Sequence, residues 1–178
     1  MIHRILFAFG KHNSSLINYN NENTATYRES GSILLYLAEK YNEMLPYDLN
    51  SRTQCKNWLF WASSGLSVQC KLFGFYYKYC PHRLPYCVSR YESEVRRLLG
   101  VLETQLEGHQ KHWVLGDQFT IADIGIWPWI YALYENYDNC IHDVFGELKE
   151  FPFIKAYYSR CTSRPASRRA LDVTRFID

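Results

Sequence analysis

The sequence predicts a mainly α-helical protein in which a bundle of helices follows a short β-hairpin and one separate helix. Three observations support this fold class. Apolar residues recur at helical spacing over most of the chain after residue 29, most prolines stand where helices begin or end, and only residues 1–28 are polar and strand-like. A hydrophobic fraction of 47% in 178 residues is sufficient for a packed core.

Composition narrows the classes of partner and compartment. The 20 basic and 18 acidic residues are well mixed and give a formal net charge of +2, so we expect no nucleic-acid partner. No apolar stretch approaches the roughly 20 residues of a membrane span, and the run Ile5–Phe9 is too short for a secretory signal, so we expect a cytoplasmic protein with no membrane association. We expect reduced, mostly buried thiols, because no C-x-x-C pair occurs among the six cysteines.

The first elements are a hairpin and a helix. The β-prone runs Ser15–Tyr19 and Thr24–Tyr27 are separated by an Asn-rich turn, which is typical of a hairpin. Ser30 suits a helix N-cap, and a helical apolar face follows it: Ile33, Leu34, Leu37, Ala38 and Tyr41. Pro46 ends this segment, and residues 46–51 are expected to form a linker.

Two long helical segments come next. The first begins near Arg52 and stays apolar to about Tyr79, with interruptions expected at Ser63–Gly65 and at Gly74. The second has the most regular apolar face of the chain: Val88, Tyr91, Val95, Leu98, Leu99, Leu102 and Leu106. Both segments are expected in the bundle.

The helix after residue 120 is apolar nearly all round and is therefore expected at the centre of the bundle. Thr120 and Asp123 have the spacing of a capping box, with Asp in place of the usual Glu. Pro128 should remove one backbone hydrogen bond and bend this helix. Pro152 and Pro165 are expected at the first positions of two closing helices.

Four motifs together resemble the glutathione S-transferase superfamily, in particular its nu class of disulfide-bond oxidoreductases. They are Glu29–Lys40, Trp58–Trp61, Leu84–Tyr91 and Leu115–Trp129, and the resemblance covers residues 27–170. It implies a glutathione-transferase C-terminal helical bundle preceded by a partial thioredoxin-like segment. The domain division expected from it is a remnant of the glutathione-binding domain at 1–45 and an all-helical domain at 46–178. A homodimer is also implied.

The resemblance implies that Glu29 and Ser30 bind the γ-glutamyl end of glutathione, whereas a purely structural interpretation makes them a helix cap and a dipole partner. The catalytic residue is left unassigned. Only 28 residues precede Glu29, too few for the strand–helix–strand unit that carries the sulfur-activating residue in this family. Residues 10–15 occupy the place of its cis-proline, and no cysteine precedes Cys55. We therefore expect binding to persist where catalysis does not.

The other candidate residues are aromatic or basic. Phe75, Tyr76 and Tyr79, with Tyr77 between them, are candidates for the cleft of a second substrate, although an aromatic stripe is more often core. His109 and His112 stand three apart without an acidic or cysteine partner, so we expect surface histidines and no metal.

The function implied by the resemblance is glutathione-dependent disulfide reduction or transfer of the nu type, with glutathione as co-substrate and a small disulfide or electrophile as second substrate. Two alternatives stay open at this point. One is a non-catalytic helical interaction or dimerisation module, and the other is a truncated gene product.

Overall fold

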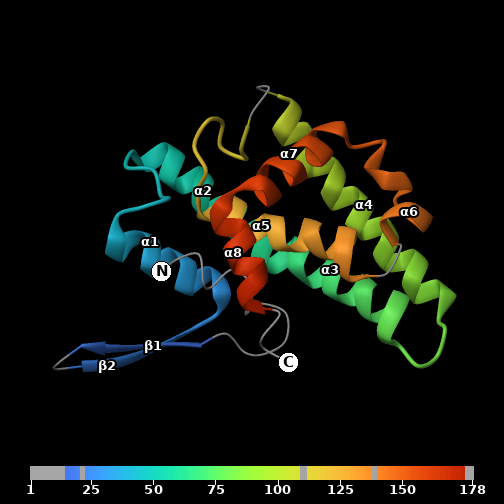
Figure 1. Cartoon of the computed structure of the whole chain (residues 1–178), viewed down its shortest axis with the longest axis horizontal. Coiled ribbons are helices and arrows are strands. Elements are labelled where there is room, and N and C mark those ends of the chain that lie inside the picture. The colour runs from blue at the N-terminus through green and yellow to red at the C-terminus, as the bar shows by residue number, and fades with distance from the viewer. Residues whose placement is uncertain (1–14, 21–22, 109–111, 138–139, 175–178) are drawn as a thin grey trace.

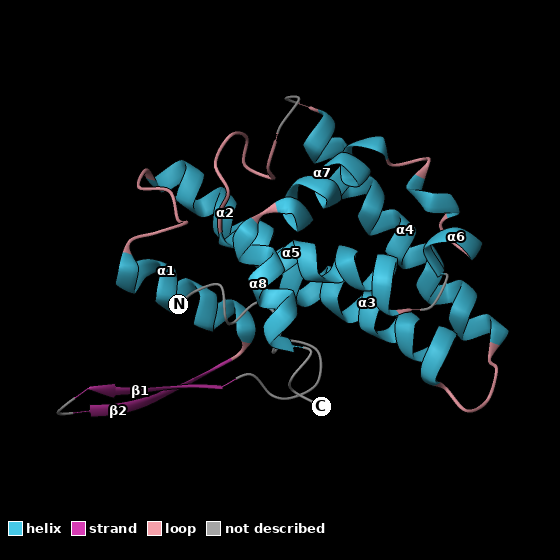
Figure 2. Ribbon diagram, viewed as in Figure 1, coloured by secondary structure: helices cyan, strands magenta, loops and turns pink. Residues whose placement is uncertain are grey.

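A hairpin extends from one corner of a helical bundle in the computed structural model (Figures 1 and 2). The structure describes residues 15–20, 23–108, 112–137 and 140–174. The predictions made for Ile5–Phe9, for residues 10–14 and for His109 lie outside these ranges. Helices dominate the described residues, as the sequence predicts, and none of the described helices is long and apolar enough to cross a membrane.

The predicted hairpin is confirmed. Strands β1 (Ser15–Asn20) and β2 (Asn23–Arg28) pair in antiparallel register. The chain passes directly from β2 into helix α1 (Ser30–Tyr41), as the blue segment of Figure 1 shows. The ring of Tyr27 stacks on that of Tyr36 with centroids 4.0 Å apart, which joins the hairpin to the helix.

The start of α1 corrects one prediction. Ser30 is the first helical residue and not the cap; Glu29 occupies the N-cap position, and its side chain makes no capping hydrogen bond. The predicted inner face is confirmed for Ile33, Leu34, Leu37 and Ala38, which are buried, but it is wrong for Tyr41, which is 42% exposed. The helix ends when Asn42 adopts a left-handed conformation with φ 53°.

The second segment is one long helical run, not a helix with breaks. Asp48 accepts the N–H of Ser51 (2.8 Å), so helix α2 begins before the expected Arg52 and takes in part of the expected linker. Where interruptions were expected, the run widens into π-helical turns, and the Ser63 hydroxyl donates to the carbonyl of Leu59 (2.9 Å). The elements of the run are α2 (Leu49–Trp61), η2 (Ala62–Leu66), α3 (Ser67–Gly74) and η3 (Phe75–Tyr79).

Helix α4 packs along α3 and turns the chain back, and α5 contacts α1, α2, α3 and α7 at the centre of the bundle (Figure 2). Pro128 lies inside α5, which continues past it; the bend expected there stays a prediction. Pro152 and Pro165 begin α7 and α8, as predicted. The bounds are α4 (Pro85–Glu107), α5 (Ile121–Tyr131), η4 (Ala132–Asn136), α6 (Cys140–Asp143), η5 (Gly146–Leu148), α7 (Pro152–Ser163) and α8 (Pro165–Thr174).

Helix α7 receives its N-terminal cap from another helix. No side chain of its own flank caps it. Instead the Glu103 carboxylate of α4 accepts the backbone N–H groups of Phe153 (2.9 Å) and Ile154 (2.8 Å). A carboxylate at a helix N-terminus also complements the helix dipole, so Glu103 ties α4 to α7.

Candidate functional site

Glu29 has a backbone conformation that residues with a side chain rarely adopt. Its φ is 65° and its ψ is 123°, at the junction of β2 and α1. Such a conformation costs on the order of 1–3 kcal/mol and persists where the surrounding structure imposes it, often at functional sites. The Glu29 side chain is exposed, so packing of that side chain does not account for the strain.

The first turn of α1 presents backbone donors beside this residue. The carbonyl of Glu29 accepts the N–H of Ile33 (2.9 Å), the first hydrogen bond of the helix. The N–H groups of residues 30–32 precede that bond and have no acceptor within the helix. With the half-buried Ser30 hydroxyl and the exposed Glu29 carboxylate, this turn offers donors for an anion and an acceptor for a cation within residues 29–32.

Close packing fixes the position of this turn. A Cβ atom added to Gly31 would lie 3.0 Å from Oγ of Ser63 and 3.8 Å from Cγ of Leu59. A Cβ added to Gly125 of α5 would lie 3.2 Å from Cδ1 of the same Leu59. Glycines at these two positions let α1 and α5 approach the α2–η2 junction closely, which holds the first turn of α1 against the bundle.

Thr120 and Asp123 form a fully buried capping box at the start of α5. The Asp123 carboxylate accepts the N–H of Thr120 (2.9 Å) and of Val114 (3.0 Å), while Oγ1 of Thr120 accepts the N–H of Ala122 (3.3 Å). Burial raises the pKa of Asp123 to about 6, partly opposed by these donors. Both residues therefore hold the loop before α5 to the helix and have no access to a ligand.

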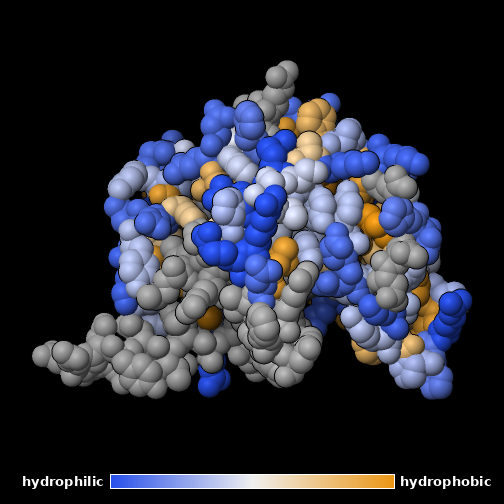
Figure 3. All heavy atoms as spheres, viewed as in Figure 1, coloured by the Kyte–Doolittle hydropathy of each residue, from blue (hydrophilic) through white to orange (hydrophobic). Residues whose placement is uncertain are grey.

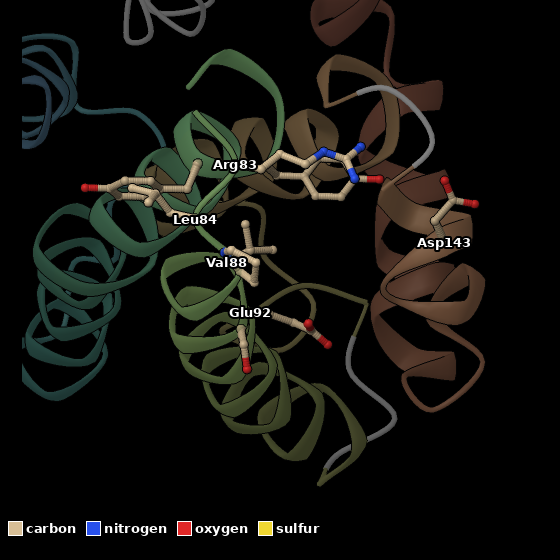
Figure 4. Close-up of a pocket in the computed structure, with 9 residues that line it drawn as sticks. Arg83, Leu84, Val88, Glu92 and Asp143 are labelled. Atoms are coloured by element: carbon tan, nitrogen blue, oxygen red, sulfur yellow. The ribbon is translucent and has the colours of Figure 1, made fainter. Parts of the chain in front are cut away.

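Only two of the four aromatic residues expected around a cleft line a pocket in the structure. Tyr76 and Tyr77 line a pocket of about 490 Å³, whereas Phe75 and Tyr79 do not line it and are 45% and 58% exposed. The other residues that line the pocket, several of them drawn in Figure 4, are Arg83, Leu84, Pro85, Val88, Ser89, Glu92 and Asp143. A cleft role for the aromatic residues stays a prediction.

Sequence reasoning did not single out the charged residues of this pocket. Arg83 precedes α4 and Asp143 ends α6, and Figure 4 shows Asp143 reaching the pocket from a separate helix. The third, Glu92, pairs with Arg96 (3.0 Å), which also contacts the carbonyl of Val144 and so ties α4 to the segment after α6. No local pattern indicates this grouping, because the residues are brought together only by folding.

The histidines give no centre for a metal in the part of the chain that the structure describes. His112 lies 3.4 Å from Asp117, and both side chains are exposed. No group of three or more potential metal ligands occurs among the described residues.

Comparison with known proteins identifies the family. Residues 79–165 match the family model "Glutathione S-transferase, C-terminal domain". Glutathione S-transferase 1 of Schizosaccharomyces pombe is 30% identical over 168 residues, which cover 89% of this chain and 72% of that protein. The chain therefore belongs to the glutathione S-transferase family.

Two further relatives refine the comparison. The disulfide-bond oxidoreductase YghU of Escherichia coli is 40% identical over 149 residues, which cover 83% of this chain and 50% of YghU. A glutathione transferase of Burkholderia graminis, solved with two glutathione molecules per subunit, superposes with a TM-score of 0.81 at 33% identity and covers 89% of this chain and 65% of that one. These relatives support the nu-like class and do not favour the interaction-module alternative, although the chain spans only half the length of YghU.

Proposed function

We propose that the protein binds glutathione at the start of α1 and acts in glutathione-dependent disulfide reduction or transfer to small electrophiles. The observation that carries this proposal is the strained backbone of the exposed Glu29, whose side chain makes no capping hydrogen bond to the helix N-terminus beside it. The names of the relatives, a disulfide-bond oxidoreductase and glutathione transferases, support the same activity.

The chemistry of the ligand matches the donors and acceptors of the turn. The γ-glutamyl end of glutathione carries one carboxylate and one ammonium group on the same carbon. The carboxylate is placed against the N–H groups of residues 30–32 and the Ser30 hydroxyl, where the helix dipole also favours an anion. The Glu29 carboxylate accepts hydrogen bonds from the ammonium group. Two neighbouring residues thus recognise a zwitterion.

The proposed site accounts for the binding of glutathione but not for the activation of its sulfur. A thiol with a pKa near 8.5 is only a few per cent ionised at about neutral pH, so catalysis requires a group that stabilises the thiolate. Neither Glu29 nor Ser30 supplies one, since a carboxylate disfavours a second negative charge and the hydroxyl is used for binding. The proposed role of this pair is to hold and orient glutathione.

We further propose that the protein forms a homodimer through the outer face of the α2–η3 run. Four apolar side chains of that run are 42–58% exposed, namely Phe60, Val68, Phe75 and Tyr79, and we call this set the α2–η3 apolar row. On the face shown in Figure 3, hydrophobic residues reach the surface only in separate patches among hydrophilic ones. A row of large exposed apolar residues along one helical run is typical of a protein–protein contact.

We also propose the domain division that the family resemblance implies. A remnant of the glutathione-binding domain covers residues 1–45, and an all-helical domain covers residues 46–178.

Calorimetric titration tests the glutathione site. Glutathione and its disulfide are titrated into the full chain and into two variants, Glu29→Ala and Glu39→Gln. Glu39 is the matched control, because it lies on the same helix and is exposed, with only a 3.8 Å ion pair to Lys56. We expect binding by the wild type and by Glu39→Gln, and at least tenfold weaker binding by Glu29→Ala. Equal affinity of all three proteins would remove the proposed site.

A further inference from the structure

Two of the six thiols differ from the rest in their exposure. Cys55, Cys70, Cys140 and Cys161 are buried, as expected of thiols that act as small apolar side chains. Cys80 and Cys87 are only partly buried, and none of the six forms a disulfide in this structure. A thiol that solvent can reach is open to exchange with small disulfides, whereas a buried one is not.

The fold places these two thiols on one seam between two helices. Tyr76 of η3 stacks on Tyr91 of α4 with ring centroids 5.4 Å apart and an interplanar angle of 8°. Cys80 follows Tyr76 by four residues, and Cys87 precedes Tyr91 by four. Since residues four apart share a helical face and the two helices run in opposite directions, both cysteines lie one turn nearer the loop that joins them.

The ends of the helical elements reinforce this placement. The N–H of Cys80 donates to the carbonyl of Phe75 (2.7 Å), so Cys80 directly follows the last turn of η3 as its C-cap residue. Cys87 is the third residue of α4. The loop at the lower right of Figure 1 joins η3 to α4 and lies between the two cysteines in sequence.

Electrostatics agree with the geometry. The pKa of the Tyr76 hydroxyl is raised, first by the charge of the Cys87 thiolate, then by burial, and then by Tyr91 and Cys80. Both sulfur groups are therefore close enough to influence the same phenol.

From this arrangement we propose that Cys80 and Cys87 are a redox pair that exchanges with glutathione disulfide. The thiolate of one cysteine attacks a sulfur of glutathione disulfide; the S–S bond breaks, and one glutathione thiolate leaves. The second cysteine, after losing its proton, attacks the protein sulfur of the mixed disulfide and releases the second glutathione thiolate. The two leaving thiolates take up the two protons. The protein dithiol is oxidised to one disulfide, and one glutathione disulfide is reduced to two glutathione molecules.

Closing this disulfide changes the rim of the pocket. Leu84 and Pro85 lie between the two cysteines in sequence, and both line the pocket with Tyr76. A bond between residues 80 and 87 restricts the loop that carries Arg83 and Leu84. The loop at the rim of the pocket is thus more restricted in the oxidised protein than in the reduced one.

The test uses the full chain and mass spectrometry. The protein is incubated with glutathione disulfide in excess, then denatured and alkylated. We expect four alkylated cysteines, no attached glutathione, and a peptide that crosslinks Cys80 to Cys87. Cys87→Ser should retain glutathione on Cys80, and Cys80→Ser should retain it on Cys87. Cys55→Ser is the control for a buried thiol and should leave the crosslink unchanged.

Two results would overturn the redox pair: wild-type protein with six alkylated cysteines after exposure, or wild-type protein that keeps glutathione on either cysteine without forming the crosslink. This proposal is independent of the site at α1. With the oxidant in excess, Glu29→Ala should still form the crosslink, so failure of the glutathione site and failure of the redox pair give different results.

Discussion

The ring of Tyr137 lies directly on the backbone of Gly74. A Cβ atom added to Gly74 would overlap three carbons of that ring, with its Cε2 atom only 2.7 Å away. Tyr137 is 8% exposed and also packs against Phe73, so it cannot move aside freely. This contact joins α3 to the end of η4, and it depends on the absence of a side chain at residue 74.

Gly74→Ala should therefore destabilise the protein by about 1–3 kcal/mol, because overpacking outweighs the better helix propensity of alanine. Urea unfolding measures the difference. Gly100→Ala is the matched control, since a Cβ there meets no atom within 4 Å. The control should be neutral or more stable by up to about 1 kcal/mol. Equal effects of the two substitutions would show that the Tyr137 ring accommodates a methyl group.

Glu29→Gly separates backbone strain from ligand binding. Glycine adopts the φ of 65° without steric cost, so this variant should be about 1 kcal/mol more stable than the wild type while glutathione affinity falls. Glu29→Ala keeps the strain and should lose affinity with little change in stability. Denaturant unfolding and calorimetry on both variants provide the comparison. A glycine variant that binds as tightly as the wild type would contradict the role of the carboxylate.

Asp123 should make stability depend on pH in a direction opposite to that of most carboxylates. Its pKa is about 6 in the folded protein against 3.8 for an ordinary aspartate, so the folded state holds the proton more tightly. Its contribution is complete below about pH 3.8 and is lost as pH rises through 6, a change of about 3 kcal/mol. Asp123→Asn cannot titrate, so the stability of wild type relative to this variant should fall between pH 4 and 6. A difference that stays constant over this range would refute the raised pKa.

Glu103→Ala should cost about 1–3 kcal/mol, because the N–H groups of Phe153 and Ile154 lose their shared acceptor. Glu103→Gln keeps one oxygen and should cost less. Thermal unfolding of both variants is compared with that of Glu107→Ala, an exposed position one turn further along α4. If the Glu103→Ala variant is as stable as the control, Glu103 does not stabilise the start of α7.

Substitutions in the α2–η3 apolar row should dissociate the proposed homodimer. Phe60→Glu and Tyr79→Glu introduce charges at side chains that are 55% and 58% exposed, so each should leave a folded monomer. Sedimentation velocity reports the molecular mass of each form. Tyr47→Glu, in the loop before α2 and 77% exposed, is the control and should stay dimeric. A wild-type protein that sediments as a monomer would dismiss this interface.

Much of the fold was predictable because its determinants are local. The apolar faces of α1 and α4, the existence of the hairpin, and the prolines that begin α7 and α8 follow from local sequence patterns. The capping box at Thr120 and Asp123 is likewise a three-residue pattern. The motif around Glu29 and Ser30 indicated the position of a site by resemblance.

Tertiary structure decided the features that join distant residues. Glu29, not Ser30, occupies the N-cap position because of how β2 meets the bundle. The close contact that holds this turn joins Gly31 to Ser63, which is 32 positions away in the sequence. Glu103 caps a helix some fifty residues later, and Arg83 and Asp143 share a pocket. The spacing of apolar residues predicts which side of a helix is buried. It does not predict which residues that side packs against, because this depends on the packing of the whole chain.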